Sequence, residues 1–206
     1  YAGNGYDGFI KTFTISSDGT SITQVSSLEH DYYIGKSNSL VKVDSDTYAL
    51  AYRGQGDDGF IKTFTVPADG SSITQVASLE HNTNYADYNS LIQVDSDTYL
   101  LAYGNVGEVV TFTIPADGSS ITEVTALQHN SGNNATSNSL VQVDSDTYAL
   151  VYQSPSNDSR GYVKTFTVAA DGSSITQVAS SIIPGEYYIG GQIVQVDSDT
   201  YLTAYG

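Results

Sequence analysis

The chain has 206 residues, a formal net charge of −16 and no cysteine, so disulfides, thiolate nucleophiles and cysteine-based metal sites are excluded. Only 7 Lys and Arg stand against 23 Asp and Glu, which disfavours nucleic acid and anionic membrane surfaces as partners, because binding phosphates needs cations. No apolar run has the length of a membrane span, so we expect no membrane insertion.

The first predicted elements are two strands within residues 8–30, joined by an Asp-Gly turn. Residues 38–81 then form the first complete unit, for which we predict four antiparallel strands. Within it, large residues alternate with alanine over residues 48–52, and a period of two is the pattern of a β-strand. Short turns rich in Asp, Ser and Gly separate the strands, and no helical period is visible.

The same unit recurs along the chain. The hexapeptide Val-Asp-Ser-Asp-Thr-Tyr begins at Val43, Val94, Val143 and Val196. The copies are about 50 residues apart, an interval typical of repeat proteins. The second and third units cover residues 89–129 and 138–183, and each predicts four strands. The fourth, residues 191–206, has room for two strands only.

The two strands missing from the fourth unit match residues 8–30, where Phe-Ile-Lys-Thr-Phe-Thr repeats the third strand of the first unit. The chain therefore resembles a β-propeller. The resemblance implies one all-β domain over residues 1–206, with four blades of four antiparallel strands. The terminal blade is expected to combine residues 191–206 with 8–30, which leaves no open strand edge. The competing hypothesis is a window of a longer, open repeat array.

The copies differ mainly in two sets of loops that the antiparallel order places on one face of the disc. The opposite face carries nearly invariant Asp-rich turns and should be strongly negative. The variable loops hold aromatic, amide and cationic side chains, which suit ligand recognition on a rigid scaffold. The predicted ligand-binding residues are Tyr32, Tyr33, Tyr85, Tyr88, Tyr187, Tyr188, Arg53, Arg160, Asn38, Asn89 and Asn138. For the tyrosines, packing on one another is an equal alternative. For the three asparagines, which begin the innermost strands, capping of strand ends is the favoured alternative.

Metal sites are weakly indicated. The repeated Asp-x-Asp pairs could ligate calcium, but hydrogen-bonded turns are favoured because a calcium shell needs more oxygens. Asp57, Asp58 and Asp7 are weaker cation candidates, and the central channel could hold a structural cation. No other cofactor is expected. His30, His81 and His129 recur after the fourth strand, where the last copy has Ile183, and this apolar equivalent favours a packed, structural role.

The function predicted from these patterns is a non-catalytic binding module, because no catalytic constellation is visible. The expected partner is an extracellular ligand, with a glycan as the first choice, and the expected location is secreted or on the cell surface. The alternative is a structural, adhesive or self-associating unit of a larger surface protein. An enzyme such as a glycosidase or lyase is the third hypothesis.

Overall fold

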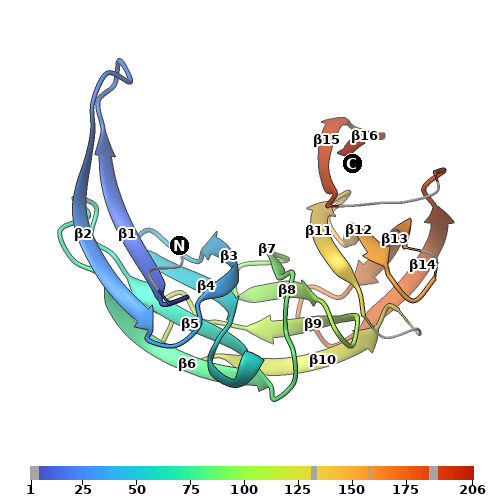
Figure 1. Cartoon of the computed structure of the whole chain (residues 1–206), viewed down its shortest axis with the longest axis horizontal. Helices are drawn as coiled ribbons and strands as arrows, with labels where there is room; N and C mark the ends of the chain where they lie inside the picture. Colours follow the sequence, from blue (N-terminus) through green and yellow to red (C-terminus); the bar gives the residue numbers. More distant parts are fainter. Residues whose placement is uncertain (1–4, 131–133, 158, 186–189) are drawn as a thin grey trace.

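The computed structural model of the chain describes residues 5–130, 134–157, 159–185 and 190–206. Within them, all regular structure is β except a short 3-10 turn at Gln55–Asp57. Three sheets have four antiparallel strands each, in consecutive order, and follow one another around an arc (Figure 1). The predicted all-β class with four-stranded blades is confirmed. No helix among the described residues is long and apolar enough to span a bilayer.

The strand bounds repeat from blade to blade. The N-terminal pair is β1 (Gly8–Ile15) and β2 (Ile22–Asp31). The first complete blade is β3 (Lys36–Lys42), β4 (Thr47–Arg53), β5 (Gly59–Thr65) and β6 (Thr74–Asn82). The second is β7 (Ser90–Gln93), β8 (Thr98–Tyr103), β9 (Glu108–Thr113) and β10 (Thr122–Gln128). The third is β11 (Thr136–Gln142), β12 (Thr147–Ser154), β13 (Arg160–Val168) and β14 (Ile175–Ile182). The C-terminal pair is β15 (Gln192–Asp197) and β16 (Thr200–Ala204).

Each blade buries aromatic side chains on one face and aliphatic ones, alanine among them, on the other. In the first blade, Leu50, Tyr52 and Phe64 pack toward the N-terminal pair, where Ile10 and Leu28 meet them. The alanines of β4 lie on the opposite face and pack against large residues of β8 and β9 in the second blade. The alternation seen in the sequence therefore separates the aromatic face of each blade from its aliphatic face, and the aromatic face of one blade packs on the aliphatic face of its neighbour.

Two hydrogen bonds recur across the blade boundaries. A serine hydroxyl of each innermost strand accepts a bond from a backbone N–H of the next innermost strand. These pairs are Leu91 to Ser39, Leu140 to Ser90 and Ile193 to Ser139, at 2.9, 3.0 and 3.2 Å. A threonine hydroxyl of β1, β5 and β9 donates to the Asp-Gly turn of the next blade. These pairs are Thr12 to Gly70, Thr63 to Gly118 and Thr111 to Gly172, each at 2.7 Å.

The histidines lie in the same boundaries. Each imidazole packs edge-on against the tyrosine at the end of the next blade's second strand. The centroid separations are 4.6 Å for His30 and Tyr52, 5.0 Å for His81 and Tyr103, and 4.6 Å for His129 and Tyr152. Neither ring nitrogen of any of the three has a hydrogen-bond partner among the described residues. Burial lowers the pKa of His81 to about 4 and that of His129 to about 3, so both are neutral at neutral pH.

The predicted pairing of the two chain ends is not formed within one chain. β1–β2 and β15–β16 are separate two-stranded sheets, and Figure 1 shows them at opposite ends of an open arc. The physical reason is the blade stacking. The packed faces and the two recurring hydrogen bonds hold successive blades at a turn too small for this number of blades to complete a circle. The sequence repeat gives no direct indication of the angle between successive blades.

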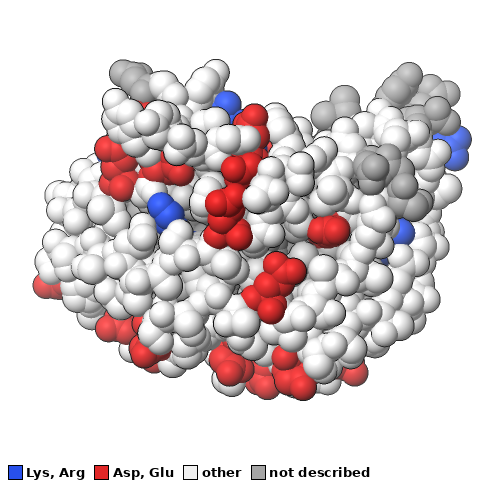
Figure 2. Space-filling view, turned by 90° about the horizontal axis from the view of Figure 1, so that it is seen from below, with Lys and Arg blue, Asp and Glu red and all other residues white. Residues whose placement is uncertain are grey.

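The constant turns gather at one end of each sheet. In the first blade the Val-Asp-Ser-Asp turn and the Asp-Gly turn are joined by the bond from Val66 N to the Asp46 carbonyl, at 2.7 Å. The carboxylate of Asp69 accepts from the Ser71 backbone N–H, and this bond lowers the pKa of Asp69. The aspartates therefore act as turn formers. Figure 2 shows acidic side chains along one margin of the surface, with no Lys or Arg visible there.

Candidate functional site

The innermost strands of the three complete blades and β15 line a polar cavity of about 710 Å³. Its wall consists of residues 37–39, 88–90, 137–139 and 190–192, together with Ala204. These segments lie at the start of the innermost strands, which is the end that carries the variable loops. Amides and hydroxyls predominate, so we call this cavity the channel mouth.

A repeated backbone feature shapes this mouth. The residue before each lining asparagine has a left-handed conformation, with φ of 51° at Ser37, 56° at Tyr88 and 57° at Ser137. The last copy has Gly190 at the same position, with φ of 59°. The pairing register slips here in the first and third blades, so the feature is a bulge at the start of the strand. Because the left-handed residue recurs in all copies, it is a structural feature of every blade and does not mark one active centre.

The three predicted asparagines all lie on the channel mouth. Their amide N–H groups donate to backbone carbonyls: Asn38 to Gly35, Asn89 to Ser37 and Ala86, and Asn138 to Tyr88, at 2.9 to 3.2 Å. The capping role is therefore real. The carbonyl oxygens of Asn89 and Asn138 have no hydrogen-bond partner among the described residues. Both oxygens are shielded from solvent, so a small side-chain shift must precede any bond to a ligand.

A charged cluster adjoins the channel mouth between the first and second blades. The Arg53 guanidinium pairs with the carboxylate of Asp87, and the other oxygen of Asp87 accepts a bond from the Ser37 hydroxyl. Asp57 lies 3.4 Å from Nε of Arg53. The ring of Tyr85 covers the guanidinium, whose carbon is 4.5 Å from the ring centroid. Arg53 is buried, so this cluster ties two variable loops to the wall of the cavity.

The structure thus brings several predicted residues together. Arg53, Tyr85, Tyr88 and the three asparagines lie on or beside the channel mouth. Tyr32 and Tyr33 pack on each other edge-to-face at 5.2 Å and remain exposed, so part of the expected mutual packing of tyrosines is present. Arg160 begins β13 in the third blade and does not line the cavity. Tyr187 and Tyr188 fall outside the described residues.

The cation candidates are not assembled into a site among the described residues. No group of three or more His, Cys, Asp or Glu side chains there is arranged to hold a metal. Asp57 forms an ion pair with Arg53, and Asp58 directly follows the 3-10 turn. Asp7 precedes β1 at the open end of the arc.

Asp87 and Ser37 were missed by the sequence analysis. The signal for Asp87 is its position, since the corresponding residues of the first and third copies are Lys36 and Thr136. A carboxylate unique to one copy, beside a buried arginine, is typical of a specialised site rather than of the repeat. Chemically, the pair offers a hydroxyl at the cavity wall with a carboxylate placed to accept its proton.

No protein-family model matches the sequence, and none of the curated proteins matches it. Solved structures do. A periplasmic gluconolactonase from Pseudomonas aeruginosa matches over 99% of this chain and 74% of its own, at 12% identity and a TM-score of 0.59. A candidate 6-phosphogluconolactonase from Bacteroides fragilis matches over 88% and 54%, at 15% identity and 0.64. The NanB sialidase from Streptococcus pneumoniae matches over 96% and 32%, at 14% identity and 0.63.

These likenesses show a fold of the lactonase-like β-propeller type. The chain spans about half the length of the Bacteroides protein, of which 54% is covered. The predicted non-catalytic binding module, and with it the prediction that the chain is not an enzyme, is overturned by the enzymes among these neighbours. The absence of a familiar catalytic motif misled the prediction, because propeller sites combine residues from separate blades.

Proposed function

We propose that the chain forms the substrate-binding mouth of a propeller hydrolase whose substrate is a small polyhydroxylated ring, with a sugar lactone as the first candidate. The observation that carries the proposal is the channel mouth, where amides and hydroxyls of successive blades surround about 710 Å³. Convergent hydrogen-bonding groups in a concave site are what a polyol requires. The gluconolactonase among the structural neighbours supports the choice of a lactone.

In this proposal the asparagines and serines hold the hydroxyl groups of the substrate. Hydrolysis adds water to the lactone carbonyl carbon, breaks the ring C–O bond and releases a hydroxy acid. Asp87 takes up the proton of the attacking water through the Ser37 hydroxyl and returns it by the same route to the departing ring oxygen, and Arg53 fixes the orientation of Asp87. A secreted or surface location is part of the same proposal, supported by the periplasmic location of one neighbour.

The test is acid release from glucono-δ-lactone, followed in a pH-stat with the spontaneous rate subtracted. We expect saturable hydrolysis, and Asp87→Asn should lower kcat about 100-fold, in the range of a lost general base. Ser37→Ala should lower it similarly. Asp69→Asn is the matched control, since it removes an exposed carboxylate from the opposite end of the first blade.

Circular dichroism of each variant separates lost chemistry from lost folding. A wild-type rate equal to the spontaneous rate for the lactone would contradict the proposal. So would an Asp87→Asn variant that folds and retains full kcat.

A further inference from the structure

The two ends of the arc are complementary halves of one blade. β15 and β16 correspond to the first and second strands of a complete blade, and β1 and β2 correspond to the third and fourth. By the register of β4 and β5, where Tyr48 faces Phe64, Tyr201 of β16 would face Phe13 of β1. The free edge of β16 is thus the edge that pairs with the third strand in a complete blade, and β1 corresponds to that third strand.

The apolar side chains of both halves are exposed, although their equivalents elsewhere are buried. Phe13 is 53% exposed, whereas its equivalent Phe64 is 0% exposed. Leu202 is 58% exposed, against 0% for Leu100 at the same position of the second blade. Because only the neighbouring strands differ between these sites, the exposure results from missing strands and not from the local sequence.

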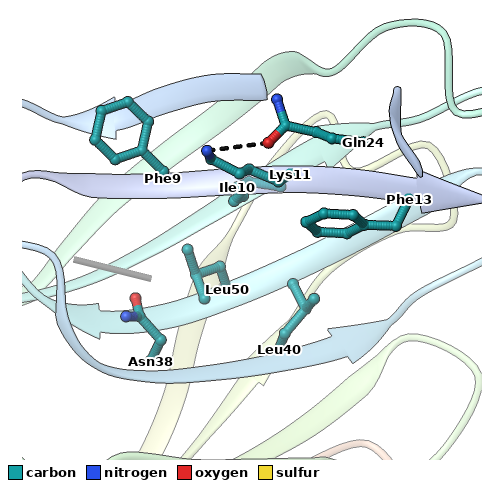
Figure 3. Close-up of a pocket in the computed structure, with 8 residues that line it drawn as sticks. All are labelled: Phe9, Ile10, Lys11, Phe13, Gln24, Asn38, Leu40 and Leu50. Atoms are coloured by element: carbon teal, nitrogen blue, oxygen red, sulfur yellow. Dashed lines mark hydrogen bonds between the residues drawn. The ribbon is translucent and has the colours of Figure 1, made fainter. Parts of the chain in front are cut away.

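The first complete blade is uncovered in the same way. Leu40 on β3 is 57% exposed, while its equivalent Leu91 is 5% exposed because the preceding innermost strand covers it. An apolar cavity of about 540 Å³ lies between β1 and this blade. Figure 3 shows Phe13 on β1, with Leu40 and Leu50 on the facing strands, bordering the same space. In the complete blades, a pair of inner strands fills the equivalent position.

The hydrogen bond from a threonine to the Asp-Gly turn of the next blade is also not formed at the two ends of the arc. A Cβ added to Gly70, Gly118 or Gly172 would meet a threonine of the preceding blade within about 3.2 Å, whereas one added to Gly19 would meet nothing within 4 Å. The threonine that ought to reach Gly19 is Thr165 of the third blade, the counterpart of Thr111. That residue lies at the opposite end of the arc in this chain and lines a small apolar cavity beside β15–β16.

We propose that a second copy of this chain closes the ring, with β16 of each copy pairing antiparallel with β1 of the other. Two composite blades result, each made of β15–β16 from one copy and β1–β2 from its partner. The inner pair of one copy then fills the cavity beside Leu40 of the other, and Thr165 of one copy reaches Gly19 of the other.

Two copies supply the strands of eight blades, within the usual range of propellers, and a two-fold axis closes the assembly without free edges. Two longer structural neighbours are covered to 52% and 54% of their length by this chain, and the Pseudomonas gluconolactonase to 74%, so each has further strands beyond those that one copy supplies. The channel mouth is open on one side in a single copy, so a second copy also completes its wall.

The oligomeric state is measured by light scattering coupled to size-exclusion chromatography. We expect twice the chain mass of 21.9 kDa, unchanged on further concentration. Leu202→Lys and Phe13→Lys should each give monomers that keep their β-sheet circular dichroism. Val124→Lys is the matched control, because Val124 is an exposed valine on β10 in the middle of the arc. It should remain dimeric.

Mixing the two monomeric variants provides a sharper test. In the mixture, one of the two interfaces joins an unaltered β16 to an unaltered β1, so dimers should return. Because the chain has no cysteine, Thr12→Cys with Leu202→Cys introduces a single reporter pair. Oxidation should give covalent dimers on a non-reducing gel.

Three outcomes would overturn the proposal. The first is a wild-type protein that is monomeric at every concentration, or a Thr12→Cys, Leu202→Cys variant whose disulfide forms within a single chain. The second is a mass that grows steadily with concentration, which indicates an open array. The third is a dimer that survives both Leu202→Lys and Phe13→Lys. None of these outcomes depends on lactone hydrolysis.

Discussion

The histidines between the blades should make the protein unstable in mild acid. His129 is the most informative, because burial and the charge of Lys164 lower its pKa to about 3 in the folded chain. In the unfolded chain its pKa returns to the ordinary value of 6.5. Between these two pH values the unfolded state binds a proton that the folded state does not, so the free energy of unfolding falls as the pH falls.

The expected size follows from these values. A proton taken up only by the unfolded state costs about 1.4 kcal/mol of stability for each pH unit. From pH 7 to pH 5, His129 alone should therefore remove about 2 kcal/mol. His81, whose pKa is lowered to about 4 by burial, should contribute a similar amount. These two histidines together should remove about 4 kcal/mol, which is a large part of the stability of an ordinary domain, and His30, whose pKa is lowered to about 4 mainly by burial, acts in the same direction.

The assay is urea unfolding at pH 7 and pH 5, followed by circular dichroism at a fixed protein concentration. His129→Ile copies the residue that the fourth repeat has at this position, Ile183. Its loss of stability between the two pH values should be about 2 kcal/mol smaller than that of the wild type. Asp69→Asn is the control, because its exposed carboxylate has a lowered pKa and does not titrate in this range. A His129→Ile variant with the same pH dependence as the wild type would refute the reasoning.

Three further changes test the packing between blades. Gly59→Ala places a Cβ 2.6 Å from the His81 ring, so it should lower the free energy of unfolding by about 1–3 kcal/mol in urea titrations. Thr63→Val keeps the volume nearly constant and removes both the bond to the Gly118 carbonyl and the bond that the Thr63 hydroxyl accepts from the Ala77 N–H; it should cost about 1 kcal/mol or more, whereas a neutral effect would show that the bond to Gly118 does not hold the blades. Arg53→Ala leaves a carboxylate without its partner and should cost about 3 kcal/mol by the same measurement; an unchanged midpoint would contradict the burial of the pair.

The strands and turns could be predicted from the sequence because their signals are local. The alternation over residues 48–52 and the Asp-Gly turns each determine a few neighbouring backbone angles, and similar patterns recur in the other copies. The position of the asparagines on the innermost strands followed from the same pattern. The fourth copy, with Ile183 in place of a histidine, indicated the packed environment that the structure confirms for His30 and His129.

The closure of the ring could not be predicted in the same way. It depends on the turn between blades, which results from how Leu50 and Phe64 pack on the preceding half-blade and how the next blade meets the alanines of β4. A repeat count gives the number of blades but not this angle. The cluster of Arg53, Asp87 and Ser37 could not be predicted either, since its members come from the end of β4, the loop before β7 and the start of β3, and meet only when the first two blades stack.

Small-angle X-ray scattering of the wild-type protein tests the central claim most directly, which is that blade stacking produces an open arc that a second copy completes. We predict a flat, closed disc of two chains, whose envelope encloses the channel from all sides. Scattering from a single compact chain with its own ends joined, or from an elongated particle that lengthens with concentration, would contradict the account.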